Sequence, residues 1–96
     1  MAKTKTTKPP LHLRLYVAGS APNSLRAIAN AKAICEEHYY ACHELEIVDL
    51  LEQPERASSD GIIVTPTLLK VSPLPARRLI GNLNDLNQVL LTLGRT

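Results

Sequence analysis

Aromatic residues are scarce in this 96-residue chain, which has no tryptophan, no phenylalanine and an aromatic content of only 3%. Proteins that bind single-stranded nucleic acids stack the bases on aromatic side chains, and this chain lacks such a platform. Its formal net charge is only +2, and part of the excess lies in Lys3, Lys5 and Lys8. We therefore expect no nucleic-acid partner and interpret residues 1–10 as a disordered basic tail.

Cysteines and long apolar runs are also few. The chain has 2 cysteines and opens with the polar stretch MAKTKTTKPP, which does not have the pattern of a signal peptide. No apolar run approaches the roughly 18 residues that a transmembrane helix requires. We therefore expect a cytoplasmic protein with free thiols and no membrane partner, and we place one small domain at residues 11–94.

The front half of the chain predicts a strand, a long helix and a second strand. Residues 11–17 alternate between two faces, with Leu11, Leu13, Leu15 and Val17 on one and His12, Arg14 and Tyr16 on the other. Ser20 or Asn23 can cap the helix that follows. Its apolar positions recur at helical spacing to about Tyr39: Leu25, Ile28, Ala31, Ile34 and Cys35. Residues 45–50 form a second strand, which a right-handed crossover places parallel to the first.

The rear half is punctuated by prolines. Pro54 and Gly61 frame a short helix over residues 55–60. Thr65-Pro66-Thr67 then interrupts a strand-like run over 62–71, at the position where thioredoxin-like sheets carry a cis X-Pro bond. The stretch Ser72-Pro73-Leu74-Pro75 predicts a turn into a returning strand over 77–81.

A final helix completes the predicted order of elements. Asn82 or Asn84 can cap it, and its apolar positions fit one helical face: Leu86, Val89, Leu90 and Leu93. The resulting order β-α-β-α-β-β-α predicts an α/β fold of the thioredoxin-like type. In that fold a mixed sheet carries helices on both faces.

The chemistry of a thioredoxin-like redox enzyme needs a cysteine of low pKa at the start of the first helix. Residues 19–24 hold that position and contain no cysteine. Serine cannot replace the thiol, because its hydroxyl is far too weak an acid without an adjacent base. No pair of carboxylates and no Ser/His/Asp arrangement takes a position that we can assign to catalysis. We therefore expect neither enzyme activity nor a cofactor.

Two groups of residues leave alternatives open. Cys35, His38, Cys42 and His43 follow the spacing C-x2-H-x3-C-H, which matches no standard metal module. We expect no metal there, and interpret the group as a buried thiol with surface histidines. The alternative is a redox- or metal-responsive protein that uses Cys35 and Cys42. Arg77 and Arg78 either place one arginine on each side of an edge strand, which protects it from aggregation, or anchor a partner's carboxylates.

Several motifs resemble those of the KaiB family of circadian clock proteins. They are LRLYVAGSAPNSLRA, EIVDLLEQPE and VTPTLLKVSPLPARRLIGNL, and the likeness runs from about Leu11 to Leu93. The patterns LYVAG-x-x-PNS-x-RA and TPTL-x-KV-x-P-x-P-x-RR-x-IG are specific. The sensor domain of the clock-associated histidine kinase SasA is a related alternative.

This resemblance implies a non-enzymatic adaptor that binds the hexameric ATPase KaiC and modulates its phosphorylation cycle, with KaiA-type or SasA-type clock proteins as further partners. It also implies two folds, a ground-state tetramer and a thioredoxin-like monomer competent to bind, which differ in the rear half. By position, the implied partner-binding residues are Arg26, Arg77, Arg78, Glu55 and Gly61. The implied prolines of the switching segment are Pro66, Pro73 and Pro75.

This chain departs from the family at Gly61, where members often carry lysine, and this bears on its affinity for KaiC. The final segment LNDLNQVLLTL has helical spacing, and its leucines and glutamine favour a helix. We therefore expect the thioredoxin-like state to dominate as a monomer or weak oligomer, with the tetramer as the alternative state. A divergent KaiB-like protein that serves stress adaptation is the alternative to a clock role.

Overall fold

Within residues 11–40 and 42–94, the part of the chain that the computed structural model describes, four strands form one mixed sheet. The strands are β1 Leu11–Val17, β2 His43–Asp49, β3 Thr67–Ser72 and β4 Arg77–Ile80. Neighbours lie in the order β2-β1-β3-β4, with β1 parallel to β2 and antiparallel to β3. Strand β4 pairs antiparallel with β3. The predicted mixed sheet is therefore confirmed.

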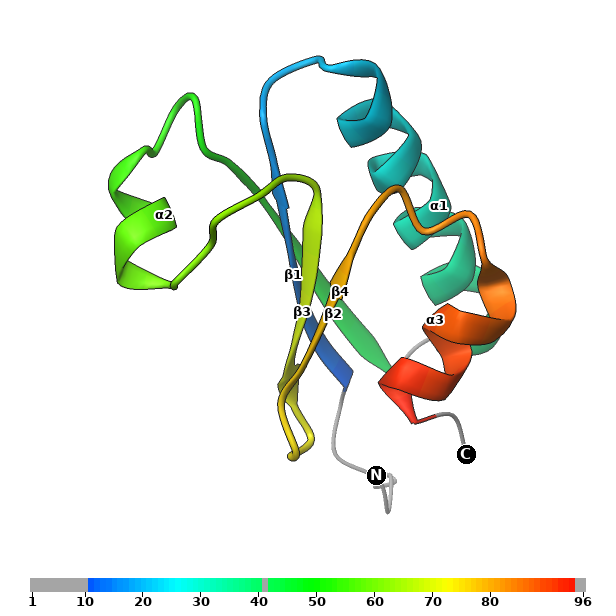
Figure 1. Ribbon diagram of the computed structural model, residues 1–96. Coiled ribbons are helices and arrows are strands. Elements are labelled where there is room, and N and C mark those ends of the chain that lie inside the picture. The colour runs from blue at the N-terminus through cyan, green and yellow to red at the C-terminus, as the bar shows by residue number, and fades with distance from the viewer. Residues whose placement is uncertain (1–10, 41, 95–96) are drawn as a thin grey trace, which may run out of the picture.

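Helices cover both faces of the sheet, but unequally (Figure 1). Helices α1 (Pro22–His38) and α3 (Leu86–Leu93) lie on one face, and the short α2 (Glu55–Ser59) lies on the other. The main core lies beneath α1 and α3, and includes Leu13, Leu15, Leu68, Val89 and Leu93. The α2 side buries a much smaller cluster of Tyr16, Val48 and Ile62. The predicted order β-α-β-α-β-β-α, with helices on both faces, is confirmed.

The predicted helix caps were wrong. Neither Ser20 nor Asn23 caps α1, because the helix starts at Pro22 and its N-cap, Ala21, makes no side-chain capping bond. Proline suits this position since the first helical amide has no intrahelical partner. Helix α3 is capped by Asp85, whose carboxylate accepts from Gln88 N at 3.2 Å, and not by Asn82 or Asn84.

The apolar stripe predicted for α1 was wrong at Leu25, which is 52% exposed. The buried face of α1 begins with Ser24 and Ala27, so it differs from the prediction only in the first turns. Ala31, Ile34 and Cys35 are buried as predicted, and Ile28 packs against the main core. Ser24 can be buried at little cost because its hydroxyl accepts a 3.1 Å hydrogen bond from Ala18 N. The polar residue is therefore satisfied inside, while the larger apolar one faces solvent.

The proline-rich segment also differs from the strand-like run that was predicted. Strand β3 begins only at Thr67, so residues 62–64 belong to the loop that enters it. The peptide bonds before Pro66, Pro73 and Pro75 are all cis. The last two prolines lie between β3 and β4, where the sequence predicted a turn.

Two expectations concern parts of the molecule that these elements do not test. The basic tail, residues 1–10, lies outside the described residues. The interpretation of residues 11–94 as one domain stays a prediction.

Among the described helices, none combines the length and the apolar character that a membrane span requires.

Candidate docking surface

Charged side chains line the α2 face of the sheet. The strand register places Glu46 of β2 beside Arg14 of β1. Arg14 Nε donates to Glu46 Oε1 at 2.9 Å. Arg56 of α2 reaches the same carboxylate, with its guanidinium 3.6 Å from Glu46 Oε2. These ion pairs tie α2 to the two parallel strands below it.

Asp60, which follows α2 directly, is the centre of these contacts. Its Oδ2 accepts a 2.6 Å hydrogen bond from the Tyr16 hydroxyl and a 3.2 Å bond from Arg56 Nε. The Tyr16 bond is the main reason why the pKa of the Asp60 carboxyl lies below its ordinary value, although desolvation opposes it. Burial raises the pKa of the Tyr16 hydroxyl, and the bond to Asp60 raises it further. At neutral pH an ionised Asp60 therefore accepts from a neutral Tyr16.

Arg78 of β4 extends this network to the edge of the sheet. Its guanidinium donates to the main-chain oxygens of Gly61, at 2.7 Å, and Asp60, at 3.2 Å. Gly61 has a φ of 70°, and a Cβ built on it would lie 3.3 Å from Arg78 Nη2. Glycine is favoured here because it adopts positive φ freely and leaves room for the guanidinium.

Exposed aliphatic side chains lie at the same end of β3 and β4. Ile63 is 97% exposed and Val64 44% exposed, both in the loop that enters β3. Ile80, 63% exposed, pairs with Thr67, whose hydroxyl donates to the main-chain oxygen of Val64. Since side chains alternate along a strand, Ile80 shares the face of Arg78. We call the following residues the α2–β4 surface: Glu55, Gly61, Ile63, Val64, Arg78 and Ile80.

The predicted partner-binding residues fall on two sides of the sheet. Glu55, Gly61 and Arg78 lie on the α2 side. Arg77 shares the opposite face with Leu79, which packs against the main core. Arg26 lies on α1, exposed, with its guanidinium 3.2 Å from Asn23 Oδ1. The structure therefore brings Gly61 and Arg78 into contact, places Glu55 on the same side of the sheet, and places the other two elsewhere.

Neither the role of Asp60 nor the exposure of Ile63 and Ile80 was predictable from the sequence. Ile63 lay in an apolar run and was expected in a strand, where a side chain is at least half-covered. Asp60 stood between a short helix and a glycine, a common position for a solvated acid. Its contacts with Tyr16 join residues 44 positions apart, so only the packed fold reveals them.

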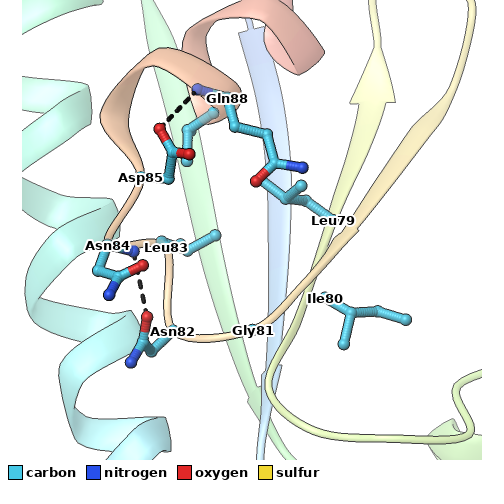
Figure 2. Close-up of a pocket in the computed structure, with 9 residues that line it drawn as sticks. Leu79, Ile80, Gly81, Asn82, Leu83, Asn84, Asp85 and Gln88 are labelled. Carbon is cyan, nitrogen blue, oxygen red and sulfur yellow. Dashed lines mark hydrogen bonds between the residues drawn. The ribbon is translucent and has the colours of Figure 1, made fainter.

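A small pocket of about 100 Å³ lies between β4 and α3 (Figure 2). Its polar groups are used to shape the turn. Asn82 Oδ1 accepts from Asn84 N at 3.1 Å, and Asp85 caps α3 through Gln88. Asn30 of α1 donates to the main-chain oxygen of Asn82 at 2.8 Å. This pocket therefore has a structural explanation, as the joint between β4, α3 and α1.

The four candidate metal ligands are not brought together. Among residues 11–40 and 42–94, no three His, Cys, Asp or Glu side chains gather as a metal site. Both Cys35 and Cys42 are free thiols. Cys35 is buried in the main core, and burial raises the pKa of its thiol to about 11, with a smaller contribution from Glu36. His43 Nδ1 lies 2.9 Å from the main-chain oxygen of Tyr39. A redox role for Cys35 is disfavoured, because the thiolate is the reactive form.

The two thiols are expected to react at very different rates. A thiol of pKa about 11 is ionised in about one molecule per thousand at pH ~8, and Cys35 is also buried. Iodoacetamide should therefore label the half-buried Cys42 first, as peptide mass spectrometry can show. Labelling in urea serves as the control, since both thiols should then react alike. Equal rates in the folded protein would restore Cys35 as a redox candidate.

Comparison with known proteins places this chain in a family. The model of the KaiB domain matches residues 14–95. The Circadian clock oscillator protein KaiB of Synechococcus elongatus is 48% identical over 81 residues, which cover 84% of this chain and 79% of that protein. The KaiB of Microcystis aeruginosa is 47% identical over 81 residues, covering 84% and 78% of the two chains.

Solved structures agree with the thioredoxin-like fold. The N-terminal domain of Synechococcus elongatus SasA superposes with a TM-score of 0.73 at 26% identity, covering 97% of this chain and 91% of that domain. Fasciola hepatica thioredoxin superposes with a TM-score of 0.72 at 17% identity, covering 93% and 84%, and shows likeness of fold alone. With a thioredoxin-like architecture and a family match over most of its length, the chain belongs to the KaiB family.

Proposed function

We propose that this chain is a non-enzymatic clock regulator that docks onto a KaiC-type ATPase through the α2–β4 surface and modulates its phosphorylation cycle. Two lines support the proposal. Relatives that are 48% identical to this chain over 81 residues are named circadian clock oscillator proteins. In addition, residues 19–24 contain no thiol at the place where thioredoxin-like redox enzymes need one. Docking takes place in the cytoplasm.

The observation that carries the proposal is the combination of exposed aliphatic and basic groups on the α2–β4 surface. Ile63 is 97% exposed, and Val64 and Ile80 lie at the same end of the sheet. Isolated apolar side chains at a surface are ordinary, but several branched ones beside an arginine resemble the centre and rim of an interface. The fitting partner surface has an apolar hollow bordered by carboxylates.

The residues on the other side suit a second partner. Arg26 on α1 and Arg77 on β4 are both exposed and lie away from the α2–β4 surface. A KaiA-type or SasA-type protein could bind there while the ATPase occupies the α2 side. The two sets of basic residues would then serve different partners.

We also propose that the rear half changes fold, with Pro66, Pro73 and Pro75 in the segment that is rebuilt. The structure has the thioredoxin-like arrangement, and the alternative would be the tetrameric state. A partner shifts the equilibrium toward one state only to the extent that it binds that state more tightly than the other. In this scheme the ATPase selects the thioredoxin-like monomer.

The proposal is tested by titrating the purified chain against a KaiC-type ATPase with ATP and measuring the Kd. Ile63→Ser is expected to weaken binding roughly tenfold or more, as for the central residues of other interfaces. The matched control is Leu91→Ser, which changes another highly exposed aliphatic side chain, on α3, at 80% exposure. Ile63→Ser should leave the melting temperature unchanged, and Leu91→Ser should lower it only slightly, because serine is a poorer helix former than leucine. Loss of affinity in both variants alike, or no binding by the unaltered chain, would contradict the proposal.

A further inference from the structure

Asp60 and Gly61 connect elements that are far apart in the sequence. The Asp60 carboxylate is held by Tyr16 of β1 at 2.6 Å and by Arg56 of α2 at 3.2 Å. On the other side, the main-chain oxygens of Asp60 and Gly61 are held by Arg78 of β4. One short stretch of backbone therefore links β1, α2 and β4.

This arrangement restricts the conformation of the Arg78 side chain. A free arginine at an exposed strand edge samples many rotamers, and ordering it on binding costs conformational entropy. Here two N–H groups of the guanidinium are already held, at 2.7 and 3.2 Å. Guanidinium has further N–H donors, which stay available to a carboxylate. The position of these donors depends on the carbonyls of Asp60 and Gly61, to which Arg78 donates.

The turn that carries these carbonyls is fixed to the sheet by the Asp60 side chain. A peptide unit is planar, so the bonds from Gly61 N to Ser58 O, at 3.3 Å, and from Ile62 N to Ala57 O, at 2.8 Å, orient the two carbonyls relative to α2. The bond between the Asp60 carboxylate and Tyr16 then fixes the turn, and with it both carbonyls, relative to β1. Tyr16 is 0% exposed and its ring is packed with Val48 and Ile62. Its hydroxyl is therefore a fixed point, unlike the exposed side chains around α2.

We propose that Asp60 is a positioning residue of the α2–β4 surface: held by Tyr16, it orients Arg78 to receive a carboxylate of the docking partner. Asp60 itself does not touch the partner in this scheme. The inference rests on the proposed function for the identity of the partner, a KaiC-type ATPase. Its intramolecular part, the ordering of Arg78, concerns the free chain alone.

The free chain gives the first test. NMR relaxation of the Arg78 Nε–Hε group reports the order of the side chain on the ps–ns timescale. We expect an ordered signal in the unaltered protein and a clear loss of order in Tyr16→Phe. The loss should be smaller in Asp60→Asn, because the amide oxygen of asparagine can still accept from Tyr16. Tyr16→Phe keeps the buried ring and removes only the hydroxyl, so it covers the case in which Asp60→Asn folds poorly. An equally ordered Arg78 in Tyr16→Phe would overturn the proposal.

Binding to the ATPase gives the second test, as a double-mutant cycle. Tyr16→Phe is expected to weaken the Kd roughly 3- to 30-fold, the range for residues that act on a site without touching its ligand. In an Arg78→Met background the same change should have no further effect. In an Arg77→Met background, the matched control, its full effect should remain. Equal weakening in all backgrounds would show general destabilisation and overturn the positioning role.

The two proposals fail in distinguishable ways. If the unaltered chain does not bind the ATPase, the proposed function fails, while the order of Arg78 in the free chain still decides whether Asp60 holds it. If the chain binds and the cycle shows no coupling to Arg78, the docking function stands and the positioning role falls.

Discussion

Replacement of Leu15 by alanine is expected to lower the free energy of unfolding by about 3–5 kcal/mol, a large part of the stability of a domain of this size. Leu15 is 0% exposed and lies in the middle of β1, between Ile47 of β2 and Leu68 of β3. Its side chain packs in the main core beneath α1 and α3. The substitution leaves a cavity, which cannot close fully because the sheet holds the flanking strands in place. The loss of stability therefore exceeds the transfer free energy of the removed methyl and methylene groups alone.

Urea unfolding followed by circular dichroism measures this change. The matched control is Leu25→Ala on α1, which removes the same atoms from a side chain that is 52% exposed. Alanine is the best helix former, so this control should change the free energy by less than about 1 kcal/mol. If Leu25→Ala costs as much as Leu15→Ala, the observed placement of α1 on the sheet is wrong.

The contrast between these two leucines shows what the sequence could and could not predict. The alternation of residues 11–17 predicted the buried face of β1 correctly, because a strand has only two faces. On α1 the predicted apolar stripe was wrong only at its start, where Ser24 is buried in place of Leu25. Ser24 and Ala27 are small enough for the helix to lie close to the sheet, and Ser24 finds a partner in Ala18 N. Hydrophobic periodicity gives no weight to a buried serine, so it favoured Leu25.

The docking surface was predictable only in part, for a similar reason. The family motifs pointed to Glu55, Gly61 and Arg78, which the structure places on one side of the sheet. The contact between Arg78 and Gly61 spans 17 residues and depends on how α2 closes over β1. Local sequence patterns carry no information on that closure. Strand alternation already suggested opposite faces for Arg77 and Arg78, and the structure adds the bonds from Arg78 to Gly61 and Asp60 that distinguish the two arginines.

The other large effect is expected for Tyr16→Ala, which should lower the free energy of unfolding by about 3–5 kcal/mol. The ring of Tyr16 is fully buried and forms the α2-side cluster with Val48 and Ile62. Its removal empties most of that small cluster. It also leaves Asp60 without its shortest hydrogen bond, which the neighbouring arginines compensate only in part. Helix α2 should therefore lose its protection against hydrogen exchange before the rest of the sheet does.

Two further variants separate the contributions of the ring and the hydroxyl. Tyr16→Phe keeps the ring and should cost about 1–3 kcal/mol, as expected for a hydrogen bond to a charged group. His12→Ala changes a half-buried residue on the same face of β1 and should cost less than about 1 kcal/mol. Denaturant unfolding of the three variants tests this order.

The expected order follows from the length of α2. Its five residues, Glu55–Ser59, cover only one end of the sheet, so Tyr16 is enclosed while His12, at the other end of β1, stays half-exposed. The sequence assigned both residues to one face and could not tell them apart. If His12→Ala proved as costly as Tyr16→Ala, the α2 face would be covered along its whole length. The uncovered half of that face would then have to be closed by another segment or a second chain.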